Sequence, residues 1–144
     1  VVTNTVVKKI CDEPVSLFVR PDHPLVGEDF ETSDLGTYHH LLWASECCYS
    51  KAFINKMQRA GCPSFHYMEF INTETIKQCA LSGLGIATLT DITVEKEVDE
   101  GKLVKLNWDI EETFNSYMIW NKYRAEYPAL KYFIETAEDH FNVL

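Results

Sequence analysis

The sequence NTETIKQCALSGLGIATL, residues 72–89, decides the fold. Asn72 or Thr73 is a good N-cap for a helix, and Glu74 follows in the expected first turn. Apolar residues then recur on one helical face at Ile76, Cys79 and Ala80. The Ser-Gly-Leu-Gly sequence at 82–85 ends this helix and turns the chain, because glycine adopts the backbone conformations that a sharp turn requires. Residues 86–89 are expected to form a buried strand, so the stretch predicts a helix, a turn and a strand in succession.

Strands and helices alternate on both sides of this stretch. Short apolar runs predict further strands at 14–19, 41–44, 67–71, 103–106 and 117–120. Helical periodicity predicts further helices at 49–60, 91–98 and 128–141. Residues 1–12 are rich in β-branched side chains and are expected to be an edge strand or a connection. The whole pattern predicts an α/β fold with a largely parallel sheet.

Bulk properties narrow the class of protein further. The 144 residues are enough for one domain, and 46% hydrophobic with 24% charged residues is an ordinary globular composition. The formal net charge is −9, and an acidic surface repels the phosphate backbone, so this segment is not expected to bind nucleic acid by itself. No apolar run is long enough to span a bilayer, and no secretory signal opens the chain.

The cysteines and histidines predict neither disulfides nor a metal. The chain has five cysteines with no C-x-x-C pair, which favours free thiols in a reducing, cytoplasmic compartment. The five histidines include no i, i+4 pair, so no metal site and no cofactor are expected. The pair Gly83 and Gly85 follows a helix and precedes a strand, the reverse of a nucleotide-binding loop, and is interpreted as a helix end and tight turn.

Four segments, in this order and spacing, resemble the effector domains of LysR-type bacterial transcription regulators. Residues 13–25, EPVSLFVRPDHPL, are similar to the family pattern EPL-x-LV-x-PP-D-HPL. Residues 74–87 are similar to the family's helix, turn and strand around G-L-G-I-A, and residues 97–104 to its E-L-x-x-G-x-L-V. The last segment, 128–134, is similar to the closing helix, so the resemblance covers about residues 13–140. Two positions depart from the pattern: Thr90 stands where the family usually has proline, and Ser50-Lys51 follows Tyr49 where an arginine is usual.

The resemblance implies an α/β, periplasmic-binding-protein-like (type 2) effector domain, in which small molecules bind between two lobes. The chain is then expected to contain the second lobe, about residues 21–119, plus part of the first lobe, about residues 1–20 and 120–144. The early strands of the first lobe and the N-terminal helix-turn-helix that binds DNA are expected to be absent from it. A small-molecule effector and a second copy of the chain, in a homodimer, are the expected partners, with no membrane contact and no catalysis.

Three groups of residues are candidate effector-binding sites. The first group is the loop that leads into the helix at 49–60, where unpaired backbone N–H groups attract anions: Ser45, Glu46, Cys47, Cys48 and Tyr49. The second group, Asn72 and Thr73, precedes the next helix. The third is the segment of Phe18 and Arg20, in which the guanidinium suits a carboxylate. Each group also has a purely structural interpretation, as a helix cap for the first two and a surface arginine beside a rigid turn for the third. Glu46 disfavours an anionic ligand unless its side chain points away.

Three other functions remain open from the sequence alone. A transporter's solute-binding protein would have the same fold, although five unpaired cysteines and the absence of an export signal argue against it. A thiol enzyme could use Cys47 or Cys48 but would need a nearby histidine base. Cys48 could also sense oxidants, because a thiol at a helix N-terminus reacts more readily and peroxide-sensing members of the family carry a reactive cysteine in a similar loop.

Overall fold

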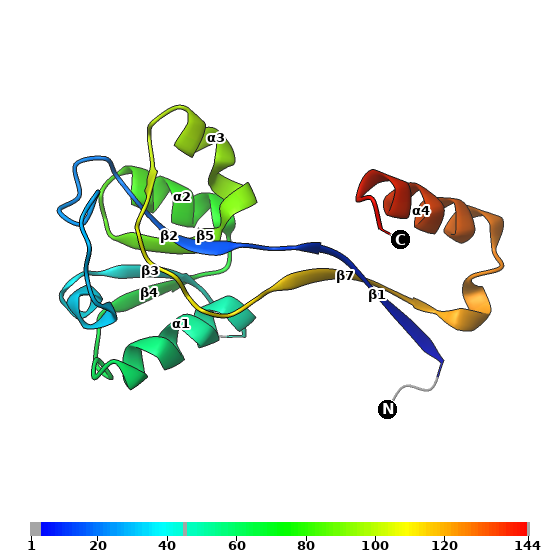
Figure 1. Ribbon diagram of the computed structural model, residues 1–144, viewed down its shortest axis with the longest axis horizontal. Helices are drawn as coiled ribbons and strands as arrows, with labels where there is room; N and C mark the ends of the chain where they lie inside the picture. Colours follow the sequence, from blue (N-terminus) through cyan, green and yellow to red (C-terminus); the bar gives the residue numbers. More distant parts are fainter. Residues whose placement is uncertain (1–3, 45, 144) are drawn as a thin grey trace. The chain divides into compact units, whose positions relative to one another are not determined.

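A computed structural model describes residues 4–44 and 46–143, and the chain divides into two compact units (Figure 1). Unit 2 comprises Pro14–Glu112, and unit 1 comprises Val1–Glu13 together with Thr113–Leu144. The predicted second lobe, about residues 21–119, overlaps unit 2, which instead begins at Pro14 and ends at Glu112. The chain passes from one unit to the other at 13/14 and again at 112/113.

Unit 2 contains a five-stranded sheet in the order β4-β3-β5-β2-β6. Its strands are β2 (Val15–Val19), β3 (His40–Trp43), β4 (Tyr67–Phe70), β5 (Ile86–Thr90) and β6 (Val104–Lys105). Strand β3 pairs in parallel with β4 and β5, whereas β2 is antiparallel to β5 and β6. The sheet is therefore mixed, and the prediction of a largely parallel sheet is wrong for β2. A short apolar run is equally compatible with either direction, so its composition could not reveal this.

Helices cover both faces of this sheet (Figure 1). They are η1 (Thr32–Thr37), α1 (Cys48–Arg59), α2 (Thr73–Leu81), η2 (Asp91–Val94) and α3 (Glu95–Asp99). Successive residues of a strand point to opposite faces, so β3 contributes to two cores. Leu41 packs with Ile76 and Ala80 of α2, whereas the ring of His40 lies 5.0 Å from that of Phe53 on α1. The predicted helix starting near Tyr49 and the predicted helix near residue 73 are thus both present.

The turn between α2 and β5 has the predicted role of helix end and tight turn. Gly83 has a φ of +81° and Leu84 donates its N–H to the Cys79 carbonyl at 3.0 Å, which closes the helix. Gly85 then passes so close to His39 that a Cβ at this position would lie 2.5 Å from the His39 carbonyl oxygen. The next residue, Ile86, donates its N–H to the same carbonyl at 2.9 Å, which begins the parallel pairing of β5 with β3.

Unit 1 is a two-stranded antiparallel sheet with one long helix. Strand β1 (Thr5–Asp12) pairs with β7 (Asn115–Asn121), and η3 (Lys122–Arg124) leads to α4 (Pro128–His140). The first twelve residues thus supply a strand, one of the two structures expected for them. Lys8 joins β1 to α4 through an ion pair with Glu138 at 2.6 Å.

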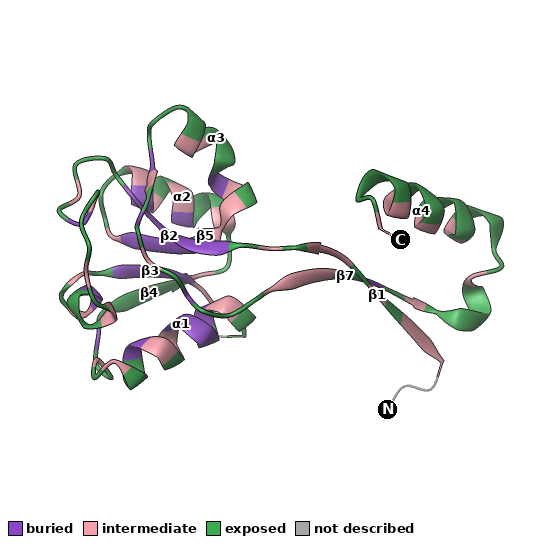
Figure 2. Cartoon of the chain, viewed as in Figure 1, coloured by how far each residue is buried: buried purple, intermediate pink, exposed green. Residues whose placement is uncertain are grey.

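Unit 1 has almost no core of its own. Met118 is the only buried residue among its described positions, and Figure 2 shows burial concentrated in unit 2. Eight large apolar side chains of unit 1 are instead more than two fifths exposed: Val7, Tyr117, Ile119, Tyr123, Tyr127, Tyr132, Phe133 and Phe141. Since apolar burial is the main source of folding stability, unit 1 is not expected to be stable by itself.

We expect the free energy of unfolding to depend on His40 between pH 6.5 and about 4. The His40 Nε2–H donates to the Leu35 carbonyl at 2.8 Å, and Nδ1 is buried without a partner among the described residues. Burial lowers the pKa of His40 from 6.5 to about 4, because the charged ring would be desolvated. The unfolded chain therefore binds the proton first, and stability present above pH 6.5 decreases by about 1.4 kcal/mol per pH unit as pH falls through this window.

Urea titrations between pH 7 and pH 4.5 would measure this slope. In H40Q the slope should become much smaller. A remainder is expected from His23, because burial also lowers its pKa, and, towards pH 4.5, from Glu74, Glu97 and Glu100, whose pKa values are lowered chiefly by hydrogen bonds. The control variant H66Q alters an exposed histidine and should keep the slope. An unchanged slope in H40Q would contradict the prediction.

A second expectation concerns Gly85. In G85A the new methyl group would meet the His39 backbone, which cannot move without disturbing the β3–β5 pairing. We expect a loss of about 2–3 kcal/mol in the free energy of unfolding, as for an overpacked core position. The control G101A has open space around its Cβ and a φ of +70°, so only the backbone term of about 1 kcal/mol applies. Equal losses in the two variants would show that the close contact is unimportant.

Candidate functional site

The carboxyl ends of three parallel strands meet at one edge of the unit 2 sheet. Strands β3, β4 and β5 all run the same way, and α1, α2 and η2 begin after them. Small molecules bind at such edges in open α/β folds because polar loop groups and helix N-termini converge there. We use "carboxyl-edge site" for the described residues at the ends of β3 and β4 and the helices that follow: Trp43, Glu46, Cys47, Cys48, Tyr49, Asn72 and Thr73.

Two hydrogen bonds hold the loops of this site together. Ala44 donates its N–H to the Phe70 carbonyl at 2.8 Å, and the Trp43 indole N–H donates to Thr73 Oγ1 at 3.0 Å. The first and second groups of predicted residues therefore lie beside one another, although they are far apart in sequence. The Thr73 oxygen is occupied as an acceptor, so its hydroxyl hydrogen remains available to donate to a further acceptor.

Asn72 combines a structural role with a possible binding role. Its Oδ1 accepts the Thr75 N–H at 3.1 Å and caps α2, as the structural interpretation of this residue predicted. The side chain is exposed, and its amide group provides two further donors. Glu74 in the same turn is bound by Gln78 and faces Lys77, and these contacts lower the pKa of its carboxyl. At neutral pH this carboxylate is already paired within the helix.

The loop before α1 offers hydrogen-bond donors rather than charge. Cys47 is the N-cap of α1, but its side chain does not accept a hydrogen bond from the N–H groups of the first helical turn. Burial, together with a hydrogen bond to Cys47, raises the pKa of Tyr49, so its phenol keeps its proton at neutral pH. Glu46 points into solvent, with 93% of its side chain exposed, and pairs with Lys51 at 3.4 Å. Its carboxylate therefore does not oppose an anion at the helix N-terminus. Ser45, also predicted here, lies outside the described residues.

The structure does not bring Phe18 and Arg20 to this site. Phe18 is 1% exposed and belongs to the core beneath α2, so it cannot contact a ligand. Strand β2 is antiparallel to β5, so its end at Arg20 lies at the opposite edge of the sheet. There the Arg20 guanidinium donates two hydrogen bonds of 3.1 Å to the Asp22 carboxylate and lies beside Gly83. The sequence analysis expected the boundary between the lobes at about residue 20, whereas the chain enters unit 2 at Pro14.

Two parts of the edge were not predicted from the sequence. Trp43 was assigned only to a strand, although an indole at the end of a strand needs a hydrogen-bond partner, and this requirement was the available signal. At the end of β5, Asp91 accepts from Ser16 Oγ at 2.6 Å and from Lys105 Nζ at 3.0 Å. Thr90, noted as a departure from the family pattern, bonds its hydroxyl to that of Thr93.

Other chemistries receive no support from the described part of the chain. The cysteines at positions 11, 47, 48, 62 and 79 are all free, and no group of three or more metal-ligating side chains occurs among the described residues. No described helix is long and apolar enough to cross a bilayer. The arrangement as a whole is a set of neutral donors at two helix N-termini, which suits a small ligand with acceptor oxygens.

Comparisons with known proteins agree with this architecture. The family model of the LysR substrate binding domain matches residues 3–142, and the chain belongs to this family. Its fold is therefore the periplasmic-binding-protein-like type 2 fold, and its class is a regulatory rather than an enzyme family.

Among curated sequences, the chain is 28% identical over 136 residues to YwqM of Bacillus subtilis, an uncharacterized HTH-type transcriptional regulator, covering 94% of this chain and 46% of that protein. It is 31% identical over 129 residues to the RuBisCO operon transcriptional regulator of Acidithiobacillus ferrooxidans, covering 89% and 40%. The chain thus spans less than half the length of these relatives.

Among solved structures, the regulatory domain of Synechocystis CcmR in complex with 2-PG has a TM-score of 0.78 at 18% identity, covering 98% of this chain and 69% of that one. The CrgA regulatory domain of Neisseria meningitidis has a TM-score of 0.72, also at 18% identity, covering 97% and 71%.

We expect T73V to release the indole of Trp43. Valine keeps the shape of threonine but cannot accept the indole hydrogen bond, so the variant should lose about 1 kcal/mol of stability. The indole N–H signal, assigned with W43F, should shift and exchange faster with solvent. The control T75V changes an exposed position whose backbone N–H stays capped by Asn72, and should leave that signal unchanged. A Trp43 signal insensitive to T73V would contradict the contact.

Proposed function

We propose that this chain is the effector-sensing part of a LysR-type transcription regulator and that a small metabolite with carboxylate or phosphate oxygens binds at the carboxyl-edge site. The observation that carries the proposal is the Trp43–Thr73 hydrogen bond, which links the end of β3, just before α1, to the first residue of α2. Helix N-termini attract anions through unpaired N–H groups and the helix dipole. The Thr73 hydroxyl and the Asn72 amide supply further donors.

Regulation would follow from a shift in a conformational equilibrium. A ligand changes the arrangement of the two units only if it binds one arrangement more tightly than the other. That shift would then alter the spacing of DNA-binding helices in a dimer of the complete regulator. Relatives named as HTH-type regulators support this reading, and also support a cytoplasmic location and the absence of catalysis.

We further propose that unit 2 is the second lobe of an effector domain and that unit 1 is part of the first lobe. Unit 1 buries only Met118 among its described residues and exposes eight large apolar side chains. The solved regulatory domain from Synechocystis is only 69% covered by this chain. Both facts agree with a first lobe whose remaining elements, outside this chain, cover that apolar surface. The match to regulator families also favours this function over a transporter's solute-binding protein.

Calorimetric and thermal-shift titrations of the chain with a panel of small carboxylates and phosphates, including 2-PG, would test the ligand class. A binding compound at about 100 times its Kd should raise the free energy of unfolding by about 2.7 kcal/mol. T73V should weaken binding about tenfold, as for a lost hydrogen bond to a charged group.

The matched control is R20Q, which removes a cation at the opposite edge of the same sheet and should bind normally. Weaker binding in R20Q with normal binding in T73V would move the site away from the carboxyl edge. Binding of none of these anions would contradict the proposed ligand class.

A further inference from the structure

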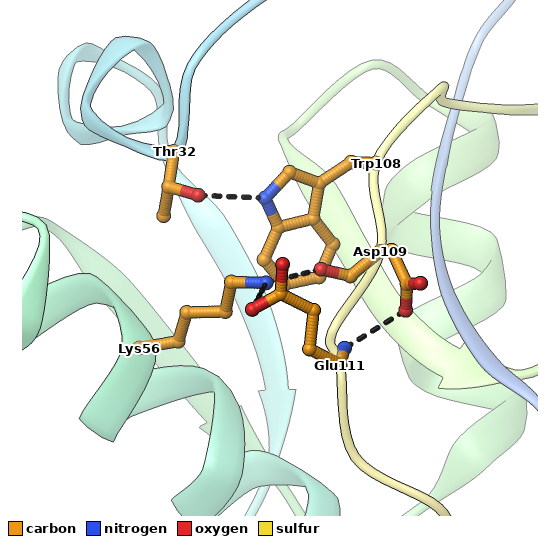
Figure 3. Close-up of polar contacts among 5 residues, drawn as sticks. All are labelled: Thr32, Lys56, Trp108, Asp109 and Glu111. Atoms are coloured by element: carbon orange, nitrogen blue, oxygen red, sulfur yellow. Dashed lines mark hydrogen bonds and ion pairs between the residues drawn. The ribbon is translucent and has the colours of Figure 1, made fainter.

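The segment between β6 and the second passage of the chain is held by one cluster of side chains, shown in Figure 3. Lys56 extends from α1, and its ammonium pairs with Glu111 at 3.2 Å and donates to the Asp109 carbonyl. The same ammonium lies 4.7 Å from the centre of the Trp108 ring. Trp108 in turn donates its indole N–H to Thr32 Oγ1 of η1 at 3.1 Å. We call these five residues the Lys56 clasp: Thr32, Lys56, Trp108, Asp109 and Glu111.

The clasp lies where the chain changes from buried to exposed residues. Ile110 is 4% exposed, and the side chain of Lys56 is only 15% exposed, so the inner side of the clasp is packed. Glu111, Glu112 and Thr113 are exposed, and the chain leaves unit 2 between the last two. All five residues of the clasp belong to unit 2, so its geometry is independent of where unit 1 lies.

Glu111 has an unusual backbone conformation for its residue type. Its φ is +60°, in the left-handed region that residues with a side chain rarely adopt. The Asp109 carboxylate accepts the Glu111 N–H at 2.8 Å, and the Lys56 ammonium holds the Glu111 carboxylate. Such conformations persist only where the surroundings enforce them, and they are concentrated at switch regions.

The other passage of the chain has a different character. Pro14 follows Glu13 directly, and its ring fixes its own φ. Its carbonyl accepts the Asp91 N–H at 2.8 Å, so the chain is anchored to the sheet from the first residue of unit 2. The second passage carries no proline, and beyond it the Glu13 N–H donates to the Phe114 carbonyl at 2.8 Å, so the backbone that can turn once the contacts of Glu111 are broken is the short stretch 111–113.

We propose that the Lys56 clasp is a latch on this passage: closed, it fixes the backbone at Glu111 and restrains movement of unit 1, and open, it lets the chain pivot there. This rests on the proposed function, in which an effector acts by shifting the arrangement of the units. The clasp would then set how much binding energy that shift requires, without touching the effector itself.

The test uses amide hydrogen exchange and 15N relaxation of the whole 144-residue chain without ligand. K56M removes the ammonium but keeps an aliphatic side chain over Trp108. It should speed exchange at Glu111 about tenfold or more, as for a lost hydrogen bond to a charged group, and leave β2, β3 and β5 protected. The rotational correlation time of unit 1 should also fall relative to that of unit 2. K56R, which keeps a cation for Glu111, should behave nearly as the unaltered chain.

The control K102M breaks an exposed ion pair with Glu100 elsewhere in unit 2 and should change neither measurement. Unchanged exchange at Glu111 in K56M, or an unchanged ratio of correlation times, would overturn the latch. Equal loss of protection throughout the sheet would also overturn it, because the clasp would then be an ordinary structural brace. Since no effector is used, failure of the carboxyl-edge site in ligand titrations would be a separate result.

Discussion

The close approach of Gly85 to the His39 carbonyl is the constraint on which the rest of unit 2 depends. It favours the parallel pairing of β5 with β3, because a Cβ at residue 85 would lie 2.5 Å from the carbonyl oxygen that accepts the Ile86 N–H. Parallel β5 and β4 on either side of β3 then bring the ends of all three strands to one edge. The helices that follow must begin there, and the carboxyl-edge site is a consequence of this register.

The sequence pattern predicted the helices and strands well but did not predict the direction of every strand in the sheet. The helix and strand around Gly83 and Gly85 were predictable because capping, periodicity and turn chemistry all agree there. The direction of β2 was not, since a buried apolar run carries no directional signal. Phe18 and Arg20 were assigned to a candidate site because a guanidinium suits a carboxylate and a lobe boundary was expected near residue 20. The antiparallel pairing instead places Arg20 at the far edge of the sheet, and Phe18 lies in the core. Asn72, Thr73 and the α1 loop were predicted as separate candidate sites, and the Trp43–Thr73 bond that brings them together was not predicted.

The two units depend on burial in very different ways. Unit 2 has a continuous core on both faces of its sheet, with Leu41 on one side and the His40–Phe53 pair on the other. Unit 1 relies on one ladder of backbone hydrogen bonds and the Lys8–Glu138 ion pair, which is a quarter exposed on each side and contributes little. The exposed aromatic residues on α4 are therefore better explained as part of an interaction surface than as ordinary solvent-facing positions.

The net charge of −9 does not conflict with an anionic ligand, because long-range and local electrostatics differ. Exposed carboxylates are screened within about 8–10 Å at physiological ionic strength. At the carboxyl edge two of them already have partners: Glu46 pairs with Lys51 at 3.4 Å, and Glu74 accepts a hydrogen bond from Gln78 and lies 3.4 Å from Lys77, which it shares with Glu97. What remains at short range is a set of N–H and O–H dipoles fixed by Asn72, by Trp43 and by the first turns of α1 and α2. Such a site should select ligands by the placement of their oxygens more than by total charge, because donors at fixed positions favour oxygens that lie in line with their N–H and O–H bonds.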